Sequence, residues 1–139
     1  MAQIHARSLT GYQVLLNSEN HAIVADEPKG VGDGVGPDPY ELLLGALGAC
    51  TVMTLQMYAR RKQWQLGGVE ADLTRERVHA ADCEECEQET GFVDRIHVRL
   101  QLSGDLDPDQ RQRLLEIADR CPVRRTLGGS ANISHELAD

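Results

Sequence analysis

The stretch GPDPYELLLGALGACT (residues 36–51) begins with the signals of a helix start and then runs almost wholly apolar to a cysteine. Asp38 can cap the first turn, Pro39 fits the first helical position, and Glu41 stands three residues after the cap, which completes a capping box. We predict a helix from Pro39 to about Arg61. Because its apolar side chains point to most sides, we expect this helix to be buried and to organise the packing around it.

The predicted helix also has a face of small residues. These residues recur at helical spacing and are Gly45, Gly48, Ala49 and Val52. Such a face lets another backbone approach closely. Residues 42–59 carry no charge and are just long enough to raise the question of a membrane span, but polar residues interrupt them. We therefore expect a buried helix and no membrane.

Ahead of the helix, three short segments have the composition of strands. Residues 2–7, 11–16 and 20–25 are rich in apolar and β-branched residues and are separated by the turn sequences TG and NSEN. We predict an antiparallel meander. Residues 26–39 contain four glycines at alternate positions and are expected to form a loop, because the phosphate-loop and dinucleotide-binding patterns are missing.

Behind the helix, two long segments read as strands, at residues 67–79 and 92–104. In the second, apolar residues alternate with polar ones, which predicts a sheet with one wet face. The apolar residues are Ile96, Val98, Leu100 and Leu102. A closing strand is expected at about Ala131–Leu137.

A second helix is predicted from Pro108. Asp107 and Gln110 form another capping box, and Pro122 is expected to end the helix. One face carries Leu114, Ile117, Ala118 and Cys121. Together these elements predict an α+β fold with antiparallel sheets and two principal helices, in one domain spanning residues 1–139.

Composition limits the partners. The net charge is −8 and aromatic residues make up 4% of the 139 residues, so nucleic acids and anionic membrane surfaces are disfavoured. The first residues show no basic region followed by an apolar stretch, so we expect a cytoplasmic location. In a reducing compartment, the four cysteines suggest redox chemistry, metal binding or plain packing rather than structural disulfides.

Cys50 and Cys121 each lie in an apolar helical pattern. One reading makes them small buried hydrophobic residues. The other makes one of them a reactive thiolate, which needs a cation, a helix N-terminus or a hydrogen bond to offset burial. Arg124 and Arg125, just after Cys121, are candidates for that cation.

The sequence CEEC, at residues 83–86, is a C-x-x-C motif in an acidic segment. The negative charges should raise the thiol pKa values, so Cys83 and Cys86 are poor nucleophiles. They are candidates either for an exposed reducible pair or for half of a zinc site. Zinc would need further ligands from His79, His97, His135 or a partner subunit.

The sequence resembles the OsmC/Ohr family of osmotically inducible and organic hydroperoxide resistance proteins, in its general OsmC-like branch. Three stretches carry the resemblance: the helix start quoted above, the segment DEPKGVGDGVG before it, and GDLDPDQRQRLLEIADRCPVRRTL near the end. The resemblance implies an intertwined homodimer with the long helix buried in its core. It also implies a thiol-dependent peroxidase without a required cofactor: Cys50 would attack a small hydrophobic hydroperoxide at the dimer interface, and Cys121 would resolve the sulfenic acid as a disulfide. An external dithiol, lipoyl-linked in one branch, would reduce it. Apolar lining is expected from Leu43, Leu47 and Met53.

In the family an arginine stabilises the thiolate and a glutamate stands at the start of the central helix. Arg7, Arg124 and Arg125 compete for the first role here, and Glu41 is the candidate for the second. The alternative is a non-catalytic OsmC-like protein that binds a small apolar or thiol ligand, with the C-x-x-C segment as a metal or redox-sensing site.

Overall fold

The computed structural model describes residues 1–83 and 91–138. The chain forms two compact units, Met1–Gly45 and Ala46–Asp139, which are described one at a time. The expectation of an α+β fold with antiparallel sheets and two principal helices is confirmed, and the described residues contain one further helix of four residues.

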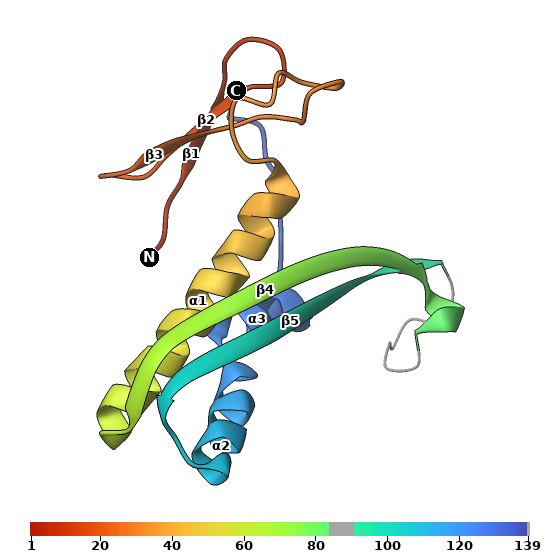
Figure 1. Ribbon diagram of the computed structural model, residues 1–139. Helices are drawn as coiled ribbons and strands as arrows, with labels where there is room; N and C mark the ends of the chain where they lie inside the picture. Colours follow the sequence, from red (N-terminus) through yellow and green to blue (C-terminus); the bar gives the residue numbers. More distant parts are fainter. Residues whose placement is uncertain (84–90, 139) are drawn as a thin grey trace. The chain divides into compact units, whose positions relative to one another are not determined.

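The first unit contains a three-stranded antiparallel sheet in the order β1-β2-β3 (Figure 1, red end of the colour scale). Its strands are β1 (His5–Ser8), β2 (Val14–Asn17) and β3 (Ala22–Ala25). Ser8 pairs with Val14 and Val14 with Ala25, so the chain turns back twice. The predicted meander is confirmed, with strands shorter than the sequence pattern suggested.

The glycine-containing loop that follows is organised by one buried carboxylate, Asp26. Its oxygens accept backbone N–H groups of Glu27 at 2.7 Å, Asp33 at 3.2 Å and Val35 at 3.1 Å. The hydrogen bond from Val35 has the largest effect and, with the others, lowers the pKa of Asp26, although burial acts in the opposite direction. The loop is therefore held by an acid that must stay ionised.

Replacing Asp26 with asparagine is expected to destabilise the protein at neutral pH. A carboxyl whose pKa is lower in the folded state stabilises that state above its unfolded pKa, and this stability is lost as the pH falls through the folded value. The difference in the free energy of unfolding between wild type and Asp26→Asn should therefore be at its full size at pH 7 and become smaller below about pH 4. Urea midpoints between pH 7 and pH 3 measure it. The exposed Asp33→Asn variant is the control, and a gap that does not change with pH would contradict this account of the loop.

Helix α1 spans Pro39–Lys62, close to its predicted limits. The Asp38 carboxylate accepts the Glu41 backbone N–H at 2.8 Å, so the predicted N-terminal cap is present. In the second unit the small-residue face is used at Gly48, where an added Cβ would lie 2.9 Å from Leu73 Cδ1. The helix thus approaches the following strand closely at this glycine.

The rest of the second unit is a long hairpin followed by short helices (Figure 1). Its elements are β4 (Gln65–His79), a 3₁₀ turn η1 (Ala80–Asp82), β5 (Phe92–Asp105), α2 (Pro108–Ala118), α3 (Pro122–Arg125) and a π-helical turn η2 (Thr126–Ser130). The two strands pair antiparallel, with Ala71 opposite Leu100 and Leu73 opposite Val98. Apart from Phe92 at its start, which is exposed, the apolar side chains of β5 are half-buried while the polar ones between them are exposed, so the predicted wet face is confirmed.

The core of this unit is formed where α1 and α2 pack against one face of the hairpin. Leu55 and Tyr58 from α1 meet Leu114 and Ile117 from α2. Surrounding them are partly buried hydrophobic residues, mainly from the hairpin: Trp64, Leu66, Val69, Leu100, Leu102, Leu106 and Ala118. The capping box of Asp107 and Gln110 that starts α2 is present, as predicted.

Two local predictions are wrong. Helix α2 ends at Ala118, before Cys121, because Pro122 starts a new helix instead of merely ending the old one. Residues 131–137 form no strand, since alternating residues alone do not supply the neighbouring strand that a ladder of hydrogen bonds requires.

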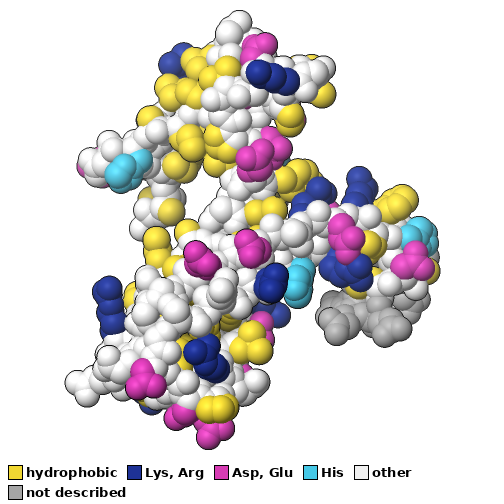
Figure 2. All heavy atoms as spheres, in the orientation of Figure 1, with side chains coloured by type: hydrophobic (Ala, Val, Ile, Leu, Met, Phe, Trp, Pro, Cys, Tyr) yellow, Lys and Arg dark blue, Asp and Glu magenta, His cyan; other side chains and the backbone are white. Residues whose placement is uncertain are grey.

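Helix α1 is less buried within one chain than its composition suggested. By length and apolarity it could cross a membrane, a test that the core helix of a soluble protein also passes. Only 28% of its most apolar window is buried, and Met53 and Met57 are 58% and 63% exposed. Hydrophobic side chains also reach the molecular surface elsewhere, as the yellow atoms in Figure 2 show.

Candidate functional site

The structure places the Cys50 and Cys121 thiols side by side in the second unit. Cys50 lies on α1, and Cys121 stands immediately before α3, as the residue that caps it. Both thiols are free, and each contributes a side-chain hydrogen bond to the other's environment. The two cysteines that the sequence singled out separately therefore form one pair.

Cys121 is the fully buried member of the pair. Burial alone would raise the pKa of its thiol. However, hydrogen bonds from the Cys50 thiol, the backbone N–H groups of Arg124 and Val123, and the Thr51 hydroxyl outweigh burial and lower the pKa. The start of α3 thus supplies backbone donors that favour a thiolate at Cys121.

Cys50 is only half-buried, and its thiol has the opposite tendency. Burial is the main cause that raises its pKa, and the interaction with Cys121 adds to it. The Val123 backbone N–H and the Thr54 hydroxyl, 4.0 Å from the sulfur, act against this rise. The first proton lost from the pair therefore comes from Cys121, and the Cys50 thiol donates a hydrogen bond to the resulting thiolate.

A pocket of about 580 Å³ lies near the pair, and Thr51 connects the two, because it lines the pocket and also contacts Cys121. Its apolar lining includes Leu47, Ile96, Val98, Leu100, Leu115 and Leu127. This size suits a small molecule, and the lining combines these apolar side chains with the charged residues Asp94, Arg95, Asp119 and Arg124. Of the predicted lining residues, Leu47 is present, whereas Met53 is exposed and does not line this pocket.

The predicted activating residues lie in different places. The Arg124 side chain pairs with Asp119 at 3.3 Å and is more than half exposed, and the Arg125 backbone N–H donates to the Cys121 carbonyl at 3.1 Å. Arg7, in β1, and Glu41, in the first turn of α1, are exposed residues of the first unit. Their roles stay predictions.

The structure describes only one of the two cysteines in the C-x-x-C motif. Cys83 lines the pocket of about 580 Å³, while Cys86 lies outside the described residues. Of the suggested extra ligands, His79 accepts the Ala81 N–H through Nδ1 at 3.2 Å and stacks edge-on with Phe92. Within residues 1–83 and 91–138, no group of three or more His, Cys, Asp or Glu side chains gathers as a metal site. The zinc prediction remains a prediction.

Sequence reasoning missed Thr51 and Tyr58. Thr51 is a buried hydroxyl in an otherwise apolar stretch, a signal that was present next to Cys50. Tyr58 had no such signal, since its partner Arg113 is 55 positions away: Arg113 Nε donates to the Tyr58 hydroxyl at 3.2 Å. Only the fold brings these two residues together.

Comparison with known proteins identifies relatives of this fold. A family model described as OsmC-like protein matches residues 32–136. No curated protein is significantly similar in sequence to the chain.

Several solved structures share the fold at low sequence identity. An OsmC-like protein from Mycoplasma pneumoniae is 21% identical with a TM-score of 0.75, over 94% of this chain and 89% of that one. An organic hydroperoxide resistance protein OsmC from Legionella pneumophila is 17% identical with a TM-score of 0.67, over 93% and 90%. The organic hydroperoxide resistance protein OhrB of Bacillus subtilis is 18% identical with a TM-score of 0.63, over 94% and 92%.

Proposed function

Because the chain belongs to the OsmC-like protein family, we propose that it reduces organic hydroperoxides with two cysteines, Cys50 reacting first and Cys121 resolving. The observation that carries the proposal is the adjoining pair of free thiols, one within reach of solvent and the other buried. Two proteins with the same fold are organic hydroperoxide resistance proteins, which supports this choice of substrate.

The division of roles follows from access rather than from acidity alone. Cys121 has the lower pKa but is fully buried, so a peroxide cannot reach its sulfur. Cys50 is half-buried and is the sulfur that a substrate can approach. Cys50 therefore reacts once it has lost its own proton, because its thiolate is the one that a peroxide can reach.

The reaction then balances in two steps. The Cys50 thiolate attacks the outer peroxide oxygen, the O–O bond breaks, and the alcohol leaves after taking up a proton, so that Cys50 becomes a sulfenic acid. The Cys121 thiolate attacks that sulfur, the S–O bond breaks, and the hydroxide leaves as water after taking up a proton from solvent, which forms a disulfide. An external dithiol reduces the disulfide by thiol exchange, and no other cofactor is needed.

The apolar side chains of the pocket next to Thr51 favour a hydrophobic hydroperoxide as the substrate. A carbon chain would bury apolar surface against Leu47 and the apolar side chains of β5, whereas hydrogen peroxide has no apolar surface to bury there. The same pocket is the place where the alternative, a non-catalytic protein that binds a small apolar ligand, would act.

We propose further that the protein is a homodimer whose interface covers α1. An apolar helix with Met53 and Met57 more than half exposed is unusual for a surface that stays in water. A second copy is the partner that the family resemblance implies. The mass measured by light scattering after size-exclusion chromatography tests this proposal, and a monomeric mass across the concentration range would overturn it.

Oxidation of the reduced protein by one equivalent of an organic hydroperoxide tests the peroxidase. We expect a Cys50–Cys121 disulfide within seconds, mapped by peptide mass spectrometry. Its rate should be higher at pH 8.5 than at pH 6.5, because a raised Cys50 pKa leaves more thiolate at the higher pH. A hydrophobic hydroperoxide should react faster than hydrogen peroxide at equal concentration.

Two outcomes would contradict the proposal. If Cys50 remains open to alkylation after minutes with the hydroperoxide, the two-cysteine reaction is wrong and ligand binding is the better account. If Cys121 becomes a sulfenic acid in the Cys50→Ser variant at the wild-type rate, the roles of the two residues are reversed.

A further inference from the structure

Thr51 is a buried hydroxyl in the apolar part of α1. It is 3% exposed, and its Oγ1 donates a hydrogen bond to the Leu47 carbonyl, one turn earlier, at 2.8 Å. The same hydroxyl hydrogen-bonds with the Cys121 side chain, which is fully buried. Thr51 therefore stands between a carbonyl of its own helix and the sulfur to which we assign the resolving step.

The Thr51 hydroxyl has one proton and two acceptors within reach. While Cys121 is a neutral thiol, Thr51 donates to the Leu47 carbonyl and is free to accept the S–H proton. A thiolate has no proton to donate, and hydrogen bonds to a charged acceptor are roughly twice as strong as those between neutral groups. Rotation about the Cβ–Oγ1 bond redirects the proton without moving a heavy atom. The Leu47 carbonyl keeps a donor, because the Thr51 backbone N–H bonds to it within the helix.

The proposed reaction removes another donor from Cys121. Its hydrogen-bond partners include the Cys50 thiol and the backbone N–H groups of Val123 and Arg124, as well as Thr51. Oxidation of Cys50 to a sulfenic acid in the first step consumes its thiol. The Cys121 thiolate is needed directly afterwards. Of the two side chains, Thr51 is the one that still has its donor in the second step.

The charged side chains that share a pocket with Thr51 are held in ion pairs. These pairs are Asp119–Arg124 at the ends of α2 and α3, and Arg75–Asp94 and Glu76–Arg95 on the hairpin. The titratable group that faces Cys121 from α1 is Cys50. Because a Cys121 thiolate is thus stabilised by uncharged donors, the loss of one hydroxyl has a measurable effect on it.

We propose that Thr51 is a positioning residue for the resolving step: its hydroxyl turns from the Leu47 carbonyl to the Cys121 sulfur when that sulfur is a thiolate, and so holds it ready to attack Cys50. This role rests on the proposed peroxidase reaction, whereas the hydrogen bond does not. If the hydroxyl only satisfied the Leu47 carbonyl, the ionisation of Cys121 would not depend on it.

The ionisation of Cys121 can be followed in the reduced protein without any hydroperoxide. In protein labelled with ¹³C-cysteine, the Cβ signal of Cys121 reports its titration, and the Cys121→Ser variant identifies that signal. Burial raises the pKa of this thiol, and the Thr51 hydroxyl is one of the donors that lower it. Thr51→Val keeps the shape but has no hydroxyl, so its midpoint should lie above that of wild type. Thr51→Ser restores the hydroxyl and should bring the midpoint back.

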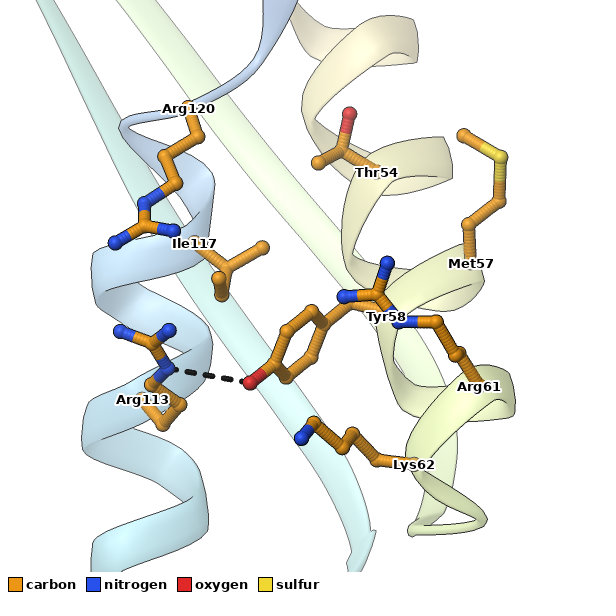
Figure 3. A pocket seen from close by; sticks show the side chains of 8 residues that line it. All are labelled: Thr54, Met57, Tyr58, Arg61, Lys62, Arg113, Ile117 and Arg120. Atoms are coloured by element: carbon orange, nitrogen blue, oxygen red, sulfur yellow. Dashed lines mark hydrogen bonds between the residues drawn. The ribbon is translucent and has the colours of Figure 1, made fainter.

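Thr54→Val is the control on the same helix. Thr54 lines a different pocket, together with Tyr58 and Ile117 (Figure 3), and its hydroxyl contacts the Cys50 sulfur at 4.0 Å. This variant should leave the Cys121 midpoint at the wild-type value. An unchanged midpoint in Thr51→Val, or an equal shift in both variants, would overturn the proposal.

The wild-type protein provides a second measurement that needs no Thr51 variant. The ¹³C signal of the Thr51 Cβ should shift with pH at the same midpoint as Cys121, because the hydroxyl changes its acceptor there. This shift should be absent in Cys121→Ser. A Thr51 signal that does not follow the Cys121 titration would contradict the proposed turn of the hydroxyl.

The role in the reaction is tested by the lifetime of the Cys50 sulfenic acid. After one equivalent of cumene hydroperoxide, at a pH below the measured wild-type midpoint, Thr51→Val should form the disulfide about three- to tenfold more slowly than wild type. The oxidation of Cys50 itself should change by less than about twofold. The difference in disulfide formation should shrink as the pH rises, because Cys121 is then ionised in both proteins.

Two results separate this role from the proposed function. A difference in disulfide formation that is the same at every pH would indicate a structural effect of the substitution and overturn the role in the resolving step. If hydroperoxide does not oxidise Cys50 in wild type, the peroxidase proposal and the role that rests on it both fail, while the titrations still decide whether Thr51 holds the Cys121 thiolate.

Discussion

Replacing Cys50 with serine is expected to abolish hydroperoxide reduction, with a fall in rate of roughly a thousandfold or more. A serine hydroxyl is not ionised near neutral pH and peroxides do not oxidise it, so the first step has no nucleophile. Cys121 cannot take over, because its sulfur is fully buried. Consumption of cumene hydroperoxide with excess dithiol measures the rate.

The Cys121→Ser variant is the matched control for this prediction. Without added dithiol, it should consume one equivalent of hydroperoxide per chain and stop, with a sulfenic acid at Cys50 that a dimedone-type reagent traps. It should form no intramolecular disulfide between the two sites. If the Cys50→Ser variant reduces hydroperoxide at more than a few per cent of the wild-type rate, the proposed mechanism is wrong.

Replacing Leu114 with alanine is expected to destabilise the protein by about 2–5 kcal/mol. Leu114 is fully buried where α2 meets α1, in contact with the cluster that contains Leu55, Tyr58 and Ile117. Shortening the Leu114 side chain removes apolar contacts and leaves a cavity. The helices cannot move together to close it, because both pack against the hairpin. Urea unfolding followed by circular dichroism measures the change in the free energy of unfolding.

The next residue supplies a control of identical chemistry. Leu115 is 53% exposed, so Leu115→Ala should change the free energy of unfolding by no more than about 0.5 kcal/mol. A loss below about 1 kcal/mol in Leu114→Ala would contradict the packing described for α2. A large loss in Leu115→Ala would instead indicate that its face is covered by a second copy.

Much of the local structure could be predicted because its causes are local. Asp38 and Asp107 cap the next turn of backbone, so a few neighbouring residues are enough to predict where α1 and α2 begin. The alternation along β5 likewise records which side chains face the helices, since successive residues of a strand point to opposite faces.

Other features failed because they depend on what lies beside a segment. Residues 131–137 have the pattern of a strand, but their backbone finds no neighbouring strand. A proline such as Pro122 can follow the end of one helix or begin the next one. In the structure it is the first residue of α3, directly after Cys121. Met53 is expected from the sequence to lie in the apolar lining of the site, yet it is exposed within one chain.

Local patterns in the sequence were enough to predict the family, the α+β class, the helix start at Pro39 and the two cysteines of interest. Packing between distant segments, by contrast, brings Cys50 and Cys121 into one environment, buries Cys121, and joins the Tyr58 hydroxyl to Arg113. The reason is physical: caps and alternation act between near neighbours. The burial and the partners of a thiol or phenol come from elements far along the chain, which meet only when the core forms.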